Sequence, residues 1–218
     1  MSDGITITRW WWVRHAPVTS LGGRIYGQDD PPADCDDATL FATLARLLPA
    51  DAVWVTSQLQ RTHQTAAAIA AAGPLELPPA VIEPDFAEQH FGEWQGLTNE
   101  ELRERRNGEL SRFWLAPAHE APPGGESFLA VIDRVAAGMA RLNAAHRGRD
   151  IVAVAHGGSI RAALAVALGI EPDRALAFSI DNCSLTRLDH IAGPGEEQSG
   201  GQWRIAAVNL HPRLPRLA

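Results

Sequence analysis

Apolar residues in this chain fall into short continuous runs and into runs spaced three or four positions apart. The continuous runs predict strands of the kind buried on both faces, at 5–13, 52–57 and 150–157. The spaced runs predict helices at 36–48, 59–73, 126–148 and 159–169. Because strands and helices alternate, we expect an α/β fold, a three-layer α/β/α arrangement with a mostly parallel central sheet.

Two later regions depart from this alternation. Residues 183–190 and 202–210 resemble a pair of strands joined by the Gly-, Glu- and Ser-rich loop 193–201. Residues 84–125 contain neither pattern and end in several Pro and Gly, so we interpret them as a small inserted cap or lid. No repeat or linker divides the chain, and we expect a single domain over 1–218 with this insertion.

Composition and charge limit the possible partners. The 218 residues are 45% hydrophobic and carry a net charge of −7, so no broad basic face is available for nucleic acid or an anionic membrane. No leader or membrane-spanning segment stands out, and we expect a cytoplasmic protein. Cys35 and Cys183 form no disulfide framework or metal motif. An anionic ligand therefore has to be small and held by a local cluster; the oligomeric state is left open.

Charged and polar residues follow each predicted strand of the parallel sheet. Arg14 and His15 end the first strand, Ser57 and Arg61 follow the second, and His156 ends the third. The carboxyl ends of parallel strands border the crevice where such sheets bind ligands. Any one of these residues alone is more commonly a turn or surface residue. Their shared location predicts one anion-binding site.

Four sequence blocks in order carry a resemblance to a known family: "VRHAP", "TSQLQRTHQTA", "EQHFGEWQGLT" and "VAHGGSIRAAL". Together they resemble the histidine phosphatase superfamily, the phosphoglycerate-mutase-like proteins. The resemblance implies that His15 is a nucleophile that takes a phosphoryl group from a small phosphorylated metabolite. It implies that Arg14, Arg61 and His156 surround the phosphate and that Glu88 is first general acid and then general base, with no cofactor or metal.

The match has departures. Ala16 replaces the family's Gly, and Leu21 stands where many members carry a phosphate-binding Asn. We expect activity to survive the first change, and we hypothesise that Arg24 or backbone N–H groups of its loop compensate for the second. Glu93 is the alternative to Glu88 as the general acid, because both lie in the same block.

Further candidate residues receive weaker interpretations. Asp29 and Asp30 have no metal-ligand spacing with His15, and two nearby Arg side chains would repel a metal ion. His63 lies two residues from Arg61 on a helix, so we expect it outside the pocket. Aromatic residues have two interpretations. The Trp run, Trp10 to Trp12, is interpreted as strand packing. The aromatic residues of the cap, which are Trp94, Phe113 and Trp114, are interpreted either as packing or as substrate contacts.

The cap suggests a branch of the family. It is short and mixed in charge, which favours a phosphomonoester hydrolase over a phosphoglycerate-type mutase. The loop "RIYGQDDPP" resembles α-ribazole phosphatases, so a sugar or nucleotide-like phosphate is expected, although fructose-bisphosphate and phosphoglycerate phosphatases also fit. A non-catalytic module that binds a phosphorylated ligand would share most of these residues. The presence of both His15 and Glu88 favours the enzyme.

Overall fold

A single mixed sheet forms the centre of the protein. The computed structural model describes residues 4–74, 78–108, 113–195 and 201–213. Within these ranges the strands lie in the order β3-β2-β4-β1-β5-β6. Their bounds are β1 (Thr6–Arg14), β2 (Ala52–Thr56), β3 (Val81–Ile82), β4 (Asp150–Ala155), β5 (Leu185–Ala192) and β6 (Gln202–Leu210). Strands β1 to β4 run parallel, whereas β5 and β6 are antiparallel. The mostly parallel sheet and the late strand pair are confirmed.

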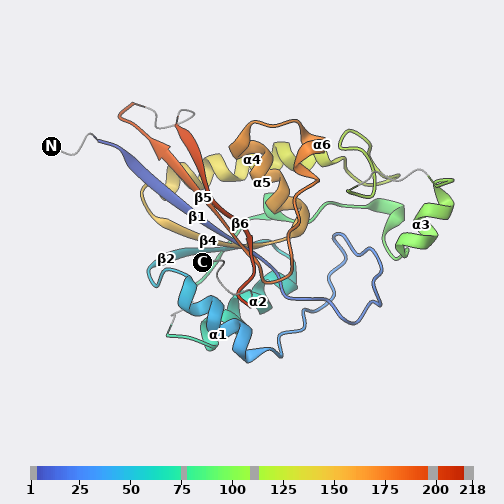
Figure 1. The fold of residues 1–218 in the computed structure, drawn as a ribbon, viewed down its shortest axis with the longest axis horizontal. Helices are drawn as coiled ribbons and strands as arrows, with labels where there is room; N and C mark the ends of the chain where they lie inside the picture. The colour runs from blue at the N-terminus through green and yellow to red at the C-terminus, as the bar shows by residue number, and fades with distance from the viewer. Residues whose placement is uncertain (1–3, 75–77, 109–112, 196–200, 214–218) are drawn as a thin grey trace.

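Helices cover both faces of this sheet, as Figure 1 shows, with α1 and α2 on one side and α4 and α5 on the other. The helices are α1 (Ala38–Leu47), α2 (Gln60–Ala71), α3 (Asn99–Arg105), α4 (Phe128–Ala145), α5 (Gly157–Leu168) and α6 (Pro172–Ala175), with single 3₁₀ turns η1 (Pro84–Phe86) and η2 (Gly92–Trp94). The four predicted helices are confirmed; three are shorter at both ends, and α5 begins two residues earlier than predicted and ends one residue earlier. Helix α3 was not predicted, although its capping box, Thr98 with Glu101, was a readable signal.

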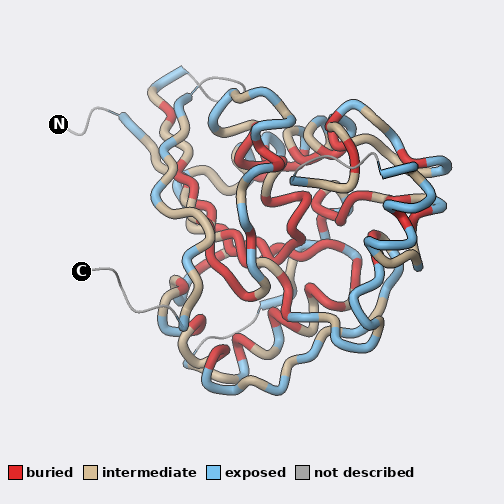
Figure 2. Tube along the Cα trace, turned by 45° about the vertical axis from the view of Figure 1, so that its right-hand side comes forward, coloured by how far each residue is buried: buried red, intermediate tan, exposed pale blue. Residues whose placement is uncertain are grey.

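The Trp run packs the sheet on both faces. Trp10 and Trp12 point to one side, where their rings stack with centroids 5.3 Å apart and both contact Phe86. Trp11 points to the other side, and its Nε1 donates to Asp150 at 2.8 Å. The packing interpretation of this run is therefore confirmed. Figure 2 shows the buried residues concentrated along the central strands and the inner sides of the helices.

Residues 84–125 pack in part on the main core, through Phe86 and Ala118, and in part form a smaller hydrophobic cluster that Ile25 joins from a neighbouring loop. The buried members of this cluster are Ile25, Phe91, Trp94, Leu102 and Ala116. That the segment acts as a lid stays a prediction. None of the helices in the described ranges is both long and apolar enough to cross a bilayer.

Candidate active site

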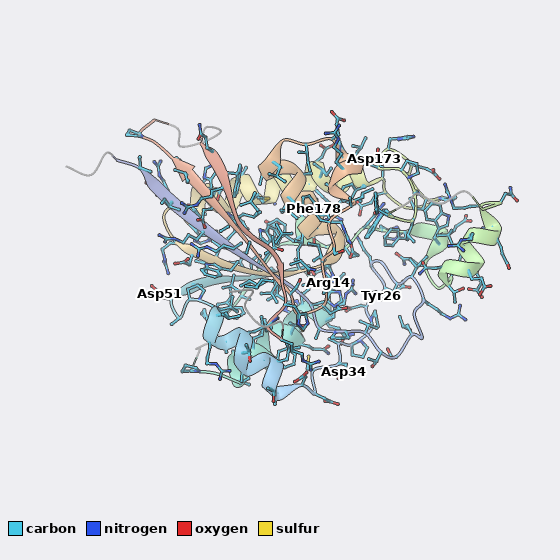
Figure 3. The ribbon with its side chains drawn as sticks, in the orientation of Figure 1. Arg14, Tyr26, Asp34, Asp51, Asp173 and Phe178 are labelled. Atoms are coloured by element: carbon cyan, nitrogen blue, oxygen red, sulfur yellow. The ribbon has the colours of Figure 1, made fainter. Side chains whose placement is uncertain are left out.

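The ends of neighbouring strands bring the predicted residues together. Arg14 at the end of β1 lies in register with Ala155 at the end of β4, so the next residues, His15 and His156, are neighbours with ring centroids 5.1 Å apart. Figure 3 shows Arg14 at this end of the sheet, whereas Asp51, just before β2, lies toward the other end. The parallel topology therefore assembles the site at one edge, as the sequence predicts.

The His15 ring is held in one orientation. Its Nδ1 lies 2.7 Å from the carbonyl oxygen of Ala16. Because a carbonyl only accepts hydrogen bonds, Nδ1 carries the proton and Nε2 keeps a free lone pair. Burial, followed by the charges of Arg61 and Arg14, lowers the pKa of His15 well below its ordinary value. The imidazole is therefore neutral at neutral pH, as a nucleophile must be.

The His156 ring is also neutral and fully engaged. Its Nε2 lies 2.8 Å from Ser57 Oγ, and its Nδ1 accepts from Arg61 Nε at 3.3 Å. Since Arg can only donate, the proton of His156 is on Nε2. Burial is the main cause that lowers the pKa of His156 well below its ordinary value, and the charge of Arg61 adds to it. Arg61 thus fixes the tautomer of the second histidine, whose Nε2–H donates to Ser57 Oγ.

Two arginines supply positive charge beside these rings. Arg61 is fully buried and donates to the carbonyl oxygens of Asp29, at 2.8 Å, and Gly27, at 2.6 Å. Arg14 donates through Nη1 to Ile180 O at 2.6 Å. Its Nε is buried and has no hydrogen-bond partner among the described residues. Because an unpaired buried donor is costly, this atom favours an anionic ligand.

The carboxylate of Glu88 is buried against the start of α5. Its Oε1 accepts from the backbone N–H of Gly158 at 3.1 Å and from that of Gln89 at 2.9 Å. In contrast, Glu93 lies at the surface in an ion pair with Arg105 at 2.9 Å. The geometry favours Glu88 over Glu93 as the carboxyl group of the site.

A pocket of about 440 Å³ opens over this edge of the sheet. Its lining includes Arg14, Tyr26, Glu88, Arg24, Arg103, Phe113 and Trp114. Trp94 is instead buried beneath Arg106. Of the three aromatic residues considered in the cap, two therefore face the pocket and one is packing.

Arg24 lies at the outer part of the pocket. Its guanidinium donates to Gly96 O at 2.7 Å and to the carboxylate of Glu101 at 3.1 Å. Both partners belong to the cap segment, so Arg24 is tied to the cap in this structure. A contact between Arg24 and the phosphate stays a prediction.

Tyr26 is a site residue that sequence reasoning missed. It lines the pocket, and the Cζ of Arg61 lies 5.0 Å from the centroid of its ring. Its ring centroid is 6.4 Å from that of His15, in an edge-on contact. Figure 3 places Tyr26 close to Arg14. It is the single tyrosine of the chain, and it lies in the loop "RIYGQDDPP", which the sequence analysis used as a sign of the branch without assigning Tyr26 a role.

The two aspartates of the loop before α1 are both hydrogen-bonded to neighbouring segments. Asp29 accepts from Gln95 at 2.7 Å, and Asp30 accepts from the backbone N–H of Gln60 at 2.8 Å. No group of three or more His, Cys, Asp or Glu side chains suited to a metal ion occurs within the described ranges. Both carboxylates thus serve to hold this loop against its neighbours.

Comparison with known proteins identifies the class that this fold and site define. The family model described as Histidine phosphatase superfamily (branch 1) matches residues 10–209. The chain belongs to this superfamily.

Curated relatives include several phosphatases. A glucosyl-3-phosphoglycerate phosphatase of Mycolicibacterium vanbaalenii is 36% identical over 171 residues, which cover 73% of this chain and 74% of that protein. A metal-independent phosphoserine phosphatase of Arabidopsis thaliana is 35% identical over 159 residues, 69% of this chain and 64% of that protein. A bifunctional protein of Mycobacterium tuberculosis is 37% identical over 138 residues, 63% of this chain. The matched region spans only 37% of the length of that relative.

Solved structures share the fold. A mycobacterial glucosyl-3-phosphoglycerate phosphatase superposes with a TM-score of 0.78 at 27% identity, covering 94% of this chain and 99% of that one. A putative α-ribazole-5'-P phosphatase of Escherichia coli superposes with a TM-score of 0.74 at 22% identity, covering 94% of this chain and 97% of that one. The resemblance to α-ribazole phosphatases is therefore one of fold.

Proposed function

We propose that this protein is a metal-independent phosphomonoester hydrolase that acts on a small phosphorylated metabolite through a phosphohistidine. The observation that carries the proposal is the orientation of His15, whose Nδ1 is bound to Ala16 O so that Nε2 is the free nucleophile. The unpaired Nε of Arg14 supports it, because a phosphate oxygen would satisfy this donor.

The first step transfers the phosphoryl group to the protein. His15 Nε2 attacks phosphorus, and the bond from phosphorus to the ester oxygen breaks. Protonated Glu88 gives its proton to that oxygen, so the leaving group departs as a neutral alcohol. Arg14 and Arg61 stabilise the charge on the three equatorial phosphoryl oxygens. The products of this step are the free alcohol and phosphohistidine.

The second step returns His15 to its starting state. The Glu88 carboxylate takes a proton from a water molecule, whose oxygen attacks phosphorus. The bond between phosphorus and Nε2 then breaks and inorganic phosphate is released. Glu88 ends protonated and His15 ends neutral, ready for another cycle.

Substrate binding requires two local changes. His15, Arg61 and His156 have exposed fractions of 1%, 0% and 0%. Tyr26 lines the pocket and contacts both His15 and Arg61, so we infer that its ring turns aside to admit a phosphate. The negative charge of that phosphate favours protonation of His156 at Nδ1. Nδ1 then stops accepting from Arg61 and becomes a donor to the phosphate. Arg61 Nε and His156 Nδ1 are then both able to donate to the phosphate.

The leaving group would occupy the outer part of the pocket, which is lined by Phe113, Trp114, Arg24 and Arg103. The names of two relatives specify glucosyl-3-phosphoglycerate and phosphoserine, which both carry a carboxylate near the phosphate ester. Arg103 lines this outer part and has no ion-pair partner among the described residues. We include in the substrate class sugar and nucleotide-like phosphates such as α-ribazole phosphate. A panel with 3-phosphoglycerate and glycerol 3-phosphate, which lacks the carboxylate, measures the contribution of the carboxylate.

The test of the proposal is trapping of the intermediate. Rapid quenching of the enzyme with a ³²P-labelled phosphomonoester should give an acid-labile, base-stable label that His15→Ala abolishes. His146→Ala, at the end of α4 and outside the pocket, is the matched control and should keep the label. Label that persists in His15→Ala would assign the nucleophile elsewhere and overturn the mechanism.

A further inference from the structure

A third arginine lies close to the site and has no part in the steps above. Arg161 follows Gly157 by one turn of α5, and its Nε donates to Phe178 O at 2.8 Å. None of the described carboxylates forms a hydrogen bond or an ion pair with it. Burial lowers the pKa of Arg161 to about 10, so it stays charged at neutral pH. A largely desolvated cation without a bonded anion is unfavourable unless other groups stabilise it.

The group that faces this cation is an aromatic ring of the cap. The Cζ of Arg161 lies 4.6 Å from the ring centroid of Trp114, within the range of a cation–π interaction. Trp114 also lines the pocket. The contact therefore joins the cap segment to the same helix whose Gly158 N–H binds the carboxylate of Glu88.

Trp114 continues this connection to the residue next to Glu88. Its Nε1 donates to the side-chain oxygen of Gln89 at 2.9 Å, and the Gln89 amide nitrogen donates to Glu126 O at 2.8 Å. The Gln89 side chain is thus held at both ends. Its backbone N–H in turn donates to Glu88 Oε1 at 2.9 Å. An unbroken series of contacts runs from Arg161 through Trp114 and Gln89 to the carboxylate.

We propose that Arg161 and Trp114 are positioning residues for the general acid, holding the Gln89 peptide so that Glu88 stays aimed at the ester oxygen. The inference rests on the proposed role of Glu88. Proton transfer depends steeply on the alignment of donor and acceptor, and displacements of about 1 Å can lower rates by about 10²-fold. Loosening this series of contacts therefore weakens protonation of the leaving group more than it weakens phosphate binding.

The test compares two substrates in variants that each remove one contact. Trp114→Phe keeps a ring over Arg161 but removes the Nε1–H that binds Gln89. Arg161→Met removes the cation and keeps most of the side-chain volume. The readout is the rate of phosphohistidine formation, measured as a burst, with an alkyl phosphate and with p-nitrophenyl phosphate. We expect both variants to slow the alkyl phosphate by about 10-fold and p-nitrophenyl phosphate by less than about 2-fold, because a nitrophenolate leaves without a proton.

A second stacked pair in the cap supplies the matched control. Arg106 lies 4.9 Å from the ring centroid of Trp94, a contact of the same kind, and neither residue bonds to Glu88 or Gln89. Trp94→Phe should leave the ratio of the two burst rates unchanged. A double variant with Glu88→Gln should show no loss from Trp114→Phe beyond that of Glu88→Gln alone, since the two act on the same proton.

Two results would separate the possible failures. If Glu88→Gln discriminates between the substrates but Trp114→Phe and Arg161→Met slow both equally, the positioning role is wrong and the proposed function stands. If Glu88→Gln itself slows both substrates equally, the general-acid role of Glu88 is wrong, and the positioning role falls with it. Additive losses in the double variant would also overturn the positioning role.

Discussion

The backbone N–H of Gly158 donates to both carboxylate oxygens of Glu88, at 3.1 Å and 3.3 Å, across a gap that no side chain could occupy. A Cβ at position 158 would lie 2.2 Å from Oε1 of Glu88, well inside van der Waals contact. The second residue of α5 therefore has to be glycine for the carboxylate to reach the amino-terminal end of this helix. The start of α5 and the carboxyl group of Glu88 therefore depend on each other for their positions.

We expect Gly158→Ala to displace Glu88 and to lower kcat/KM for an alkyl phosphate by about 10²-fold, in line with the loss of one well-placed general acid. Alanine is favoured over glycine inside a helix by up to about 1 kcal/mol, which offsets part of the cost of the clash. Steady-state kinetics together with thermal unfolding measure the two effects. A variant that keeps full activity would show that the close approach to Glu88 is not needed.

Chelation of metal ions should leave the activity intact. Arg14 and Arg61 occupy the position next to the nucleophile, and two guanidinium groups repel a divalent cation while binding phosphate oxygens. The measurement is hydrolysis of p-nitrophenyl phosphate before and after dialysis against EDTA, with a zinc-dependent phosphatase as positive control for chelation. Activity that disappears and returns with a divalent ion would contradict the proposed charge arrangement.

The stability of the fold should fall as the pH drops below about 6.5, the ordinary pKa of histidine. The pKa values of His15 and His156 are both lowered well below that value, chiefly by burial. At pH values between the lowered pKa values of the folded chain and the ordinary pKa of about 6.5, the unfolded chain binds protons that the folded chain does not. Acid therefore favours unfolding. Each histidine contributes a slope of at most about 1.4 kcal/mol per pH unit.

Urea unfolding at several pH values between about 5 and 7 measures this slope. His156→Gln removes one of the two groups and should reduce the dependence by about half. Carboxylates titrate mainly below this range, which keeps the comparison specific. An unchanged slope in the variant would show that His156 binds its proton equally well in both states.

Local sequence patterns were sufficient for the edge of the sheet that carries the chemistry. Strand ends are marked by the change from apolar to polar residues, and parallel pairing brings them to one side. This is why Arg14, His15, Arg61 and His156 meet as predicted. The family resemblance already favoured Glu88 over Glu93, and the structure adds a physical reason for that choice, because Glu88 is buried against α5 whereas Glu93 lies in a surface ion pair.

Residues that depend on long-range packing could not be predicted in this way. Arg161 is brought against Trp114 by the path of the cap, which has little periodicity to interpret. Tyr26 lies in a loop whose course is set by carbonyl contacts to Arg61. The direction of Arg24 likewise follows from an ion pair with a helix that the sequence analysis did not predict.

Substitution of Arg24 distinguishes two roles for its charge, at the phosphate or at the leaving group. A guanidinium that binds the phosphate supports every substrate and also free phosphate, because the phosphoryl group is common to all. A guanidinium tied to Glu101 in the cap supports only the leaving group. Since the structure shows the second arrangement, we expect Arg24→Gln to leave the inhibition constant of inorganic phosphate within about 2-fold of the wild type. Surface ion pairs of this kind contribute about 1 kcal/mol or less.

Arg61→Gln is the matched comparison, because Arg61 is buried beside both histidines. Hydrogen bonds to charged groups contribute about 1.5–3 kcal/mol, so this variant should weaken phosphate inhibition by about 10-fold or more. Inhibition constants are measured against p-nitrophenyl phosphate, whose leaving group carries no carboxylate. Equal losses in Arg24→Gln and Arg61→Gln would place Arg24 on the phosphate, the role that its loop suggests in the sequence. A loss confined to Arg61→Gln places Arg24 with the cap and leaves phosphate binding to Arg14, Arg61 and the histidines.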